Sequence, residues 1–452
     1  MKDLTLNNIV TAVGGEYHGD RRFLTREISF VTSDSRSAGE GCLFAAIKGE
    51  RTDGHSYIDK AAKQGAICAL AQHIPCCCTM PVIVVDDTVR ALGDLAAYYR
   101  SRLNVKILGI TGSVGKTTAK EMAFSVLSQK YRVHKTSGNF NNELGVPLTL
   151  LGIDEQCELA VVEMGISHFG EMRRLGEIVR PDMALYTAVG SAHLEFLGDF
   201  DGVLRAKTEM LDFLPDDGTV FVNGDDTTLQ KLTCRQRLCR YGVAKDCDVR
   251  AENVRVLGTD GMELDIVAGQ RRFAVKINSF GVHMVTAALG GAAVGIAAGL
   301  TDFEIAAGIA AYRPVGSRAG IVQTDRLTII DDCYNANPTS TASALDSLAM
   351  LSCRRVAILG DMGELGGNSP QLHRQTGEHA AKRGIDLVIA CGALSENTAA
   401  GAADAGASAL HFADKQALFE KLPEMLESGD AVLVKASHSQ AFEEIVEFLK
   451  NA

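Results

Sequence analysis

The sequence has no run of lysine or arginine residues, and its formal net charge is −11. A nucleic-acid-binding surface needs clustered basic side chains, so this charge argues against a nucleic-acid partner. An anionic ligand would therefore need local positive sites. The first 20 residues also lack a basic stretch followed by a long apolar core, so we expect no signal peptide and a cytoplasmic location.

Paired cysteine motifs are missing as well. The 12 cysteines are scattered over 452 residues, and the run Cys76-Cys77-Cys78 has neither CxxC spacing nor histidine partners. We therefore expect free or structural thiols rather than disulfides or a zinc site. Residues 282–300 carry almost no charge and are long enough to cross a bilayer. Because they are mainly alanine and glycine and lack aromatic or basic anchors, they predict a buried helix, and we expect no membrane span.

Apolar runs rich in valine and isoleucine alternate with helix-like segments along the chain. This pattern is typical of parallel sheets covered by helices, so the fold class is α/β. At roughly 150 residues per domain, the length suggests about three domains. We place them at residues 1–103, 104–314 and 315–452. The Arg313-Pro314-Val315-Gly316 segment predicts a hinge, because proline and glycine interrupt regular structure.

The segment ITGSVGKTT, residues 110–118, nearly matches the phosphate-binding loop G-x-x-x-x-G-K-[ST], but isoleucine stands where the first glycine should be. An apolar strand precedes it, and apolar residues at helical spacing follow Lys116. In that context the loop amides and the helix N-terminus face an anion, lysine reaches the β- and γ-phosphates, and the hydroxyl binds Mg²⁺. The alternative is a plain glycine turn before a helix. Gly-Lys-Thr at the helix start favours the nucleotide site.

The displaced glycine matches the loop T-G-x-x-G-K-[ST] of the Mur ligase family, which this chain resembles from end to end. One branch, which adds D-alanyl-D-alanine to UDP-N-acetylmuramoyl-tripeptide, is similar in further segments. They are TSGNFNNELGVPLTLL (136–151), VVEMGISHFGEM (161–172), AHLEFLGDFDGVLRAKTEML (192–211), DDCYNANPTS (331–340) and ILGDMGELG (358–366). Residues 32–58 resemble the family's uridine-nucleotide-binding segment. The resemblance implies a UDP-substrate-binding N-terminal domain, a central P-loop ATPase-type parallel sheet, and a Rossmann-like C-terminal domain that binds the dipeptide and closes on ATP.

The resemblance also implies an ATP- and Mg²⁺-dependent ligase of peptidoglycan precursor synthesis. A substrate carboxylate attacks the γ-phosphate, and the amine of the incoming dipeptide attacks the acyl phosphate that results. ATP binding is assigned to Thr111, Gly112, Ser113, Val114, Gly115, Lys116, Thr117, Thr118, His283, Arg318, Asp332, Tyr334 and Asn335. Binding of the uridine nucleotide and peptide is assigned to Ser33, Asp34, Ser35, Arg36, Asn139, Asn141 and Asn142. The partners are thus two small molecules, and a monomer is the family default.

Catalysis is assigned by the same resemblance to Lys116, His193 and Lys207, and metal binding to Thr117, Glu163, His193 and Lys207. Glu163 ends a buried strand, at the sheet edge where α/β proteins bind ligands. Lys207 matches a lysine carbamylated by CO₂, whose negative charge would help to hold a second Mg²⁺. Taken alone, Glu163 would be a solvated acid, His193 a structural histidine, Lys207 a surface lysine and Arg36 part of a solvated turn.

The chain departs from the family pattern in two places. Where related sequences carry His-Asn and a second Asn near the adenine, this chain has His283-Met284 and Ala287, and a Lys-Gly-Ser-Arg stretch is here Lys435-Ala436-Ser437-His438. The changes remove amide and guanidinium hydrogen bonds to nucleotide or substrate. Two alternatives stay open. One is a related ligase with the same ATP site that adds one amino acid, or glutamates to folate, and the other, motivated by these departures, is a nucleotide-binding homologue without catalysis. The third residue of the acceptor peptide, diaminopimelate or lysine, also stays open.

Overall fold

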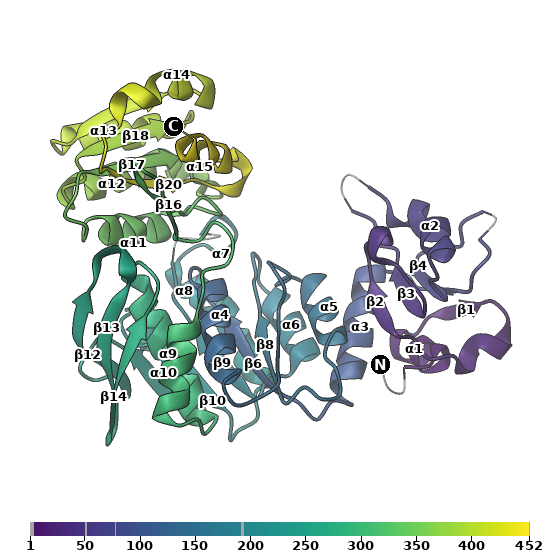
Figure 1. Cartoon of the computed structure of the whole chain (residues 1–452). Helices are drawn as coiled ribbons and strands as arrows, with labels where there is room; N and C mark the ends of the chain where they lie inside the picture. Colours follow the sequence, from purple (N-terminus) through teal and green to yellow (C-terminus); the bar gives the residue numbers. More distant parts are fainter. Residues whose placement is uncertain (1–3, 50–51, 77, 191–193, 452) are drawn as a thin grey trace. The chain divides into compact units, whose positions relative to one another are not determined.

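The computed structural model describes residues 4–49, 52–76, 78–190 and 194–451. The described strands form sheets of five, nine and six strands with helices between them, which confirms the α/β class (Figure 1). The chain divides into two compact units. One comprises Met1–Thr111, Tyr131–Ala184 and Thr208–Thr219, and the other Gly112–Lys130, Leu185–Lys207 and Val220–Ala452. The domain boundaries after residues 103 and 314 stay a prediction.

The five-stranded sheet lies in the first unit and has the order β1-β5-β4-β3-β2. Its strands are parallel except for β1, which pairs antiparallel with β5. Every residue of β3 and β4 is buried, as expected for strands covered on both faces. The elements are α1 (Leu6–Val13), β1 (Glu16–His18), β2 (Phe30–Thr32), β3 (Cys42–Ala45), α2 (Ile58–Lys63), β4 (Cys68–Ala71), β5 (Val82–Val84) and α3 (Thr88–Arg100).

The nine-stranded sheet has the order β14-β13-β12-β11-β10-β9-β6-β8-β7. Strand β8 pairs in parallel with both β6 and β7, whereas β12, β13 and β14 form an antiparallel meander. The strands are β6 (Lys106–Thr111), β7 (Val133–Lys135), β8 (Leu159–Glu163), β9 (Met183–Tyr186), β10 (Thr219–Asn223), β11 (Arg237–Gly242), β12 (Val249–Val256), β13 (Met262–Ala268) and β14 (Arg271–Ile277). The helices are α4 (Lys116–Leu127), α5 (Gly145–Leu151), α6 (Glu171–Val179), α7 (Leu194–Leu197), α8 (Phe200–Thr208), α9 (His283–Ala297) and α10 (Asp302–Ala311).

The apolar segment 282–300 forms the buried helix α9, as predicted. Its glycines let it approach α4 closely, because a Cβ at Gly291 would lie 2.9 Å from Met122 Cγ and one at Gly295 2.9 Å from Val126 Cγ1. Within the described residues, no helix is both long and apolar enough to cross a membrane. The described cysteines are free thiols, in line with the expectation from their spacing.

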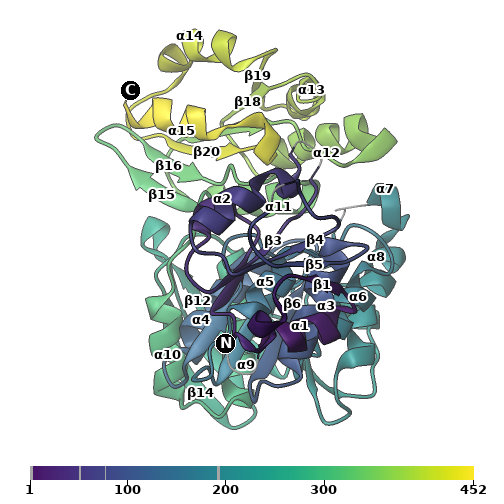
Figure 2. The same ribbon diagram turned by 90° about the vertical axis from the view of Figure 1, so that its right-hand side faces the viewer.

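The six-stranded sheet has the order β15-β16-β20-β17-β18-β19 and is parallel except for β15. Alternate strand residues face opposite sides: Ile329 and Val432 pack with α14 and α15, whereas Ile330 and Leu433 pack with α11, α12 and α13 (Figures 1 and 2). The elements are β15 (Gly320–Gln323), β16 (Thr328–Asp331), α11 (Pro338–Leu348), β17 (Arg355–Gly360), α12 (Ser369–Lys382), β18 (Leu387–Cys391), α13 (Glu396–Asp404), β19 (Ser408–Phe412), α14 (Lys415–Met425), β20 (Ala431–Lys435) and α15 (Glu443–Lys450).

Candidate active site

The predicted phosphate loop connects β6 to α4. Gly115 precedes the helix with φ +80°, a left-handed conformation that glycine adopts without strain. Gly112 lies so close to Thr187 that an added Cβ would overlap the threonine hydroxyl. That hydroxyl donates a hydrogen bond to Val114 O at 2.6 Å, and Lys116 Nζ donates one to Gly112 O at 2.7 Å. The loop therefore holds the lysine ammonium over the start of a helix, where an anion is favoured.

A pocket of about 550 Å³ adjoins this loop. Val114, Gly115 and Thr118 line it from the loop and helix α4, and His283 and Ala287 line it from α9. Burial lowers the pKa of His283, which favours the neutral form of its ring. A neutral imidazole can both donate and accept a hydrogen bond. Met284 instead points into the core and is 2% exposed. At the two positions where related sequences carry asparagine, this chain thus has Met284 in the core and the apolar Ala287 in the pocket wall.

Sequence reasoning missed several residues of this pocket. Asn223 ends β10 and donates from Nδ2 to Thr187 O at 2.9 Å. Tyr241 is buried, and its hydroxyl donates to Tyr186 O at 2.9 Å. The position of Asn223 after a buried strand is the kind of signal that identified Glu163. The remaining missed lining residues are Ala119, Thr187, Ala188, Val243, Val254, Val282, Val285, Thr286, Gly290 and Ser343.

Lys207, in α8, is fully enclosed by protein. Only 1% of it is exposed, so its interpretation as a surface lysine is wrong. Burial lowers its pKa well below the ordinary lysine value, and the positive charge of Lys116 acts in the same direction. Among the described residues, no carboxylate forms an ion pair with the Lys207 amine. Both effects destabilise the protonated form of the Lys207 amine.

Glu163 lies at the carboxyl end of β8, opposite Ile110 of β6 in the parallel ladder. It is 1% exposed, so its interpretation as a solvated acid is also wrong. Asn141 Nδ2 donates to Glu163 Oε1 at 2.8 Å, and Gly165 N donates to Asn141 O at 2.7 Å. Asn141 thus orients the carboxylate while its own backbone is held in place.

Its neighbours have different surroundings. Asn139 is exposed, and Asn142 Oδ1 accepts hydrogen bonds from the amides of Leu144 and Gly145 at the start of α5. The Asn142 amide oxygen therefore satisfies backbone amides in the turn that leads into α5. Asn141 thus contacts the predicted metal-binding carboxylate, whereas Asn142 bonds to amides at the start of α5.

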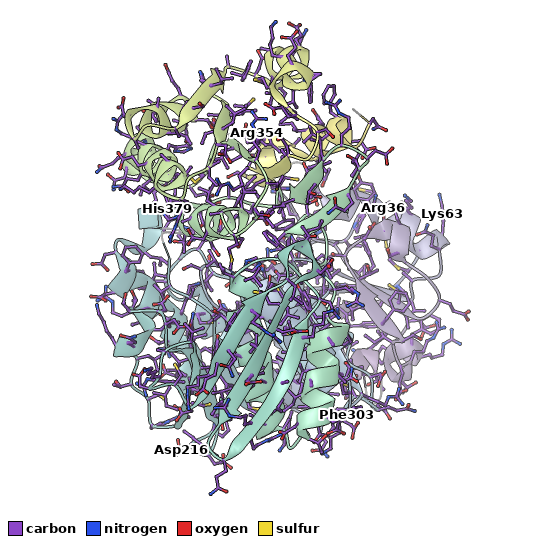
Figure 3. All side chains as sticks on the ribbon, turned by 60° about the vertical axis from the view of Figure 1, so that its left-hand side comes forward. Arg36, Lys63, Asp216, Phe303, Arg354 and His379 are labelled. Atoms are coloured by element: carbon purple, nitrogen blue, oxygen red, sulfur yellow. The ribbon has the colours of Figure 1, made fainter. Side chains whose placement is uncertain are left out.

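In the N-terminal sheet region, Asp34 and Arg36 form an ion pair of 2.8 Å. The Arg36 side chain lies at the surface (Figure 3). The side-chain hydrogen bond from Arg36 and its amide lower the pKa of Asp34 to about 2. Ser35 is buried and Ser33 half-buried. The exposed guanidinium is a local positive group of the kind that a diphosphate requires.

Three of the predicted nucleotide-binding residues of the C-terminal region, Asp332, Tyr334 and Asn335, lie in the loop between β16 and α11, and the fourth, Arg318, precedes β15. Lys435 Nζ, 2% exposed, pairs with Asp332 Oδ2 at 2.6 Å and donates to Asn335 O at 3.0 Å. The Arg318 guanidinium lies 3.7 Å from the centre of the Tyr334 ring. Of the two departures at the end of β20, Ala436 is completely buried and His438 stacks on Tyr334 with ring centres 5.6 Å apart.

The donor groups available for a metal are oxygens. Thr117 and Glu163 are 6% and 1% exposed, and hydroxyl and carboxylate oxygens are ligands that Mg²⁺ accepts together with phosphates and water. His193 lies outside the described residues. Within the described part of the chain, no three His, Cys, Asp or Glu side chains gather as a ready-made metal cluster. Taken separately, each of these two oxygen donors is of a type that a Mg²⁺ ion arriving with a nucleotide would accept.

Comparison with known proteins decides the family. Residues 27–100 match the Mur ligase family catalytic domain, residues 110–295 the Mur ligase middle domain, and residues 317–438 the Mur ligase glutamate ligase domain. A UDP-N-acetylmuramoyl-tripeptide--D-alanyl-D-alanine ligase of Escherichia coli (strain K12) is 36% identical over 459 residues, covering 100% of this chain and 99% of that protein. The chain belongs to the Mur ligase family. It is accordingly an ATP-dependent ligase.

Solved structures agree with this Mur ligase assignment. A crystal structure of MurF from Acinetobacter baumannii has a TM-score of 0.91 and 30% identity, with 99% of both chains covered. MurF from Thermotoga maritima, in complex with ADP, has a TM-score of 0.83 and 27% identity, covering 94% of this chain and 97% of that one. The three-domain α/β architecture expected from the sequence is thereby confirmed.

Proposed function

We propose that this Mur ligase joins D-alanyl-D-alanine to UDP-N-acetylmuramoyl-tripeptide with hydrolysis of ATP, in peptidoglycan precursor synthesis. The observation that carries this proposal is the similarity to D-alanyl-D-alanine ligases over the whole chain. The phosphate loop and its adjoining pocket supply a place for the nucleotide. ATP supplies the phosphoryl group that converts a carboxylate into an acyl phosphate.

In this proposal a tripeptide carboxylate oxygen bonds to the γ-phosphorus while the bond to ADP breaks. The dipeptide amine then bonds to the acyl carbon, phosphate leaves, and the amine loses a proton. Lys116 and the amides of residues 111–118 neutralise the charge on the transferring phosphoryl. Thr117, Glu163 and His193 would hold Mg²⁺, and Asn141 keeps the Glu163 carboxylate in place.

Lys207 acts in this proposal as a carbamate. Its amine adds to CO₂ and releases one proton, which converts a buried basic group into an anion. Three features support this step: the enclosure of Lys207, the lowering of its pKa, and the nearby cationic Lys116. An enclosed amine next to a cation is destabilised when it is protonated, whereas a carbamate anion in the same place is attracted to that cation. The carbamate would help to hold a second Mg²⁺.

Each predicted domain receives a role. Residues 1–103 bind the UDP group through Ser33–Arg36, and residues 104–314 bind ATP, with Asn139, Asn141 and Asn142 near the peptide. Residues 315–452 bind the dipeptide and bring Arg318, Asp332, Tyr334 and Asn335 to the nucleotide, where His283 contacts the base. We propose a cytoplasmic monomer.

Mass spectrometry of the product tests this function. Incubation with ATP, Mg²⁺, D-alanyl-D-alanine and UDP-N-acetylmuramoyl-tripeptide should give the pentapeptide nucleotide. The tripeptide is supplied in its diaminopimelate and its lysine form. Product from single amino acids or from glutamate and folate, with none from the dipeptide, would show a different ligase of the superfamily. Nucleotide binding without any ligated product would show a non-catalytic homologue.

A further inference from the structure

The guanidinium of Arg318 lies in an unusual setting for a cation. The residue is half-buried, and among the described residues no carboxylate lies within ion-pair distance of it. Its planar group is instead stacked 3.7 Å from the centre of the Tyr334 ring. A stacked guanidinium keeps the N–H groups along its edge available for a planar or tetrahedral anion.

The backbone around Arg318 is tied to the loop that carries Tyr334. On one side of Arg318, Ser317 O accepts a hydrogen bond from Tyr334 N at 3.0 Å. On the other side, Ala319 N donates to Asp332 Oδ1 at 3.2 Å, although Ala319 has the left-handed φ of +56°. These bonds hold the turn that carries Arg318 against the loop that carries the ring.

The loop itself is anchored from β20. Lys435 holds the second oxygen of Asp332 at 2.6 Å in a buried ion pair, and His438 stacks on the same tyrosine ring. Because Lys435 and His438 flank the end of one strand, both anchors of the loop come from the C-terminal sheet. Arg318 follows the predicted hinge in sequence, and its neighbours Ser317 and Ala319 are hydrogen-bonded to this anchored loop.

We propose that Tyr334 is a positioning residue, whose ring holds the Arg318 guanidinium in the orientation that binds the terminal phosphate of the nucleoside triphosphate. This inference rests on the proposed function. It goes beyond that function because Tyr334 acts on the nucleotide through Arg318 and not by touching the nucleotide itself. The ring restricts the arginine before the nucleotide arrives, so less side-chain entropy is lost when the phosphate binds.

The test compares Tyr334→Leu with the conservative Tyr334→Phe in the full chain. Loss of the ring should lower kcat for substrate-dependent phosphate release by roughly 2- to 30-fold, as for loss of a cation–π contact, and Tyr334→Phe should recover most of that loss. Binding of a non-hydrolysable ATP analogue should weaken, whereas ADP binding should change little. The matched control is Tyr98→Leu, which removes the contact between the half-buried Tyr98 ring and the exposed Arg102 guanidinium, 4.4 Å from the ring centre. This variant should leave kcat unchanged.

A double-mutant cycle separates positioning from a structural effect. If Tyr334 acts through Arg318, then Tyr334→Leu should add little to the loss caused by Arg318→Ala. Added guanidinium ion should partly restore Arg318→Ala, and less so when the ring is also removed. The inference would be overturned if the losses of the two single variants multiply in the double variant, or if Tyr334→Leu and Tyr334→Phe have equal rates. In either case, normal turnover of the unchanged enzyme would still uphold the proposed function. No turnover of the unchanged enzyme would overturn both.

Discussion

Lys116 is the single residue whose charge should matter most for phosphoryl transfer. Its ammonium already lies over the loop, 2.7 Å from Gly112 O. Lys116→Ala should lower ligation on the order of 10³-fold or more, because charge on the transferring phosphoryl loses its cation. The fold should persist, since the side chain does not fill the core. Steady-state kinetics and thermal unfolding check this, with the exposed Lys106→Ala at the other end of β6 as control. Near-normal turnover of Lys116→Ala would rule out the nucleotide site.

Lys207 tests the carbamate separately. Lys207→Ala should be nearly inactive, because a methyl group neither holds Mg²⁺ nor carries a negative charge. Acetate or formate, by occupying the vacated space, should restore part of the rate. The measurement is phosphate release at saturating ATP and Mg²⁺, with and without the acid, and the same acids added to the unchanged enzyme are the control. Full activity of Lys207→Ala would refute the carbamate role.

The burial of Lys207 also has a consequence for stability in CO₂-free buffer. Because its pKa is lowered in the folded state, the unfolded chain binds a proton that the folded chain lacks between the two pKa values, and stability rises with pH there. The destabilisation of the folded protein by Lys207 is complete below the pKa that Lys207 has in the folded state. It vanishes above the pKa of an unfolded lysine, about 10.4. Lys207→Met should therefore be more stable than the unchanged protein near pH 7, by a margin that shrinks toward pH 10.5.

Urea unfolding at several pH values measures this margin, with Lys63→Met, at an exposed lysine of α2 (Figure 3), as control. A margin that is independent of pH would contradict the burial argument.

The two buried ionisable residues Glu163 and Lys207 differ in how far the sequence could predict their surroundings. Glu163 could be predicted at the sheet edge because it ends an apolar strand. The enclosure of Lys207 could not, because it depends on packing around α8 rather than on neighbours in sequence.

At the scale of elements, the phosphate loop depends on the absence of a side chain at Gly112. An added Cβ would overlap the Thr187 hydroxyl, so Gly112→Ala should displace Thr187 and the loop. We expect a loss of about 1–3 kcal/mol in the free energy of unfolding together with weaker ATP binding. Calorimetric titration with an ATP analogue and thermal unfolding measure the two effects.

The matched control is Gly406→Ala, where φ is +93° but an added Cβ meets nothing within 4 Å. This variant introduces backbone strain without an overlap, so its stability should fall while its ATP affinity stays unchanged. Equal ATP affinities for the Gly112→Ala variant and the unchanged enzyme would show that the loop tolerates a side chain and would contradict its close approach to Thr187.

The buried strands and α9 were predictable because their apolar runs are long and bounded by turn residues. The meander β12–β14 was not predicted. In β14, the burial alternates along Arg271–Ile277 with charged residues on the exposed face, so no continuous apolar run marks it. The hinge before Arg318 stays a prediction. The stack of Arg318 with Tyr334 could not be predicted, because it joins residues that are separated by the whole of β15 and β16, and only the fold brings them together.

For the whole molecule, three sheets could be anticipated from the alternation of apolar runs and helices, and the motifs indicated the family. The division into compact units could not, because the unit that contains the phosphate loop is assembled from three separate stretches of chain. Pocket residues such as Asn223 and Tyr241 could not be predicted either, because they lie on different strands, β10 and β11, and only the folded chain brings them to one pocket. The site is therefore a property of the assembled chain rather than of the loop motif.

Phosphate release from ATP tests the central claim most directly. The full chain with ATP and Mg²⁺ is measured alone, with UDP-N-acetylmuramoyl-tripeptide, with D-alanyl-D-alanine, and with both. Ligation through an acyl phosphate predicts sustained release only when both substrates are present, with one phosphate formed for each amide bond. Release that is independent of either substrate, or no release with both, would contradict the account.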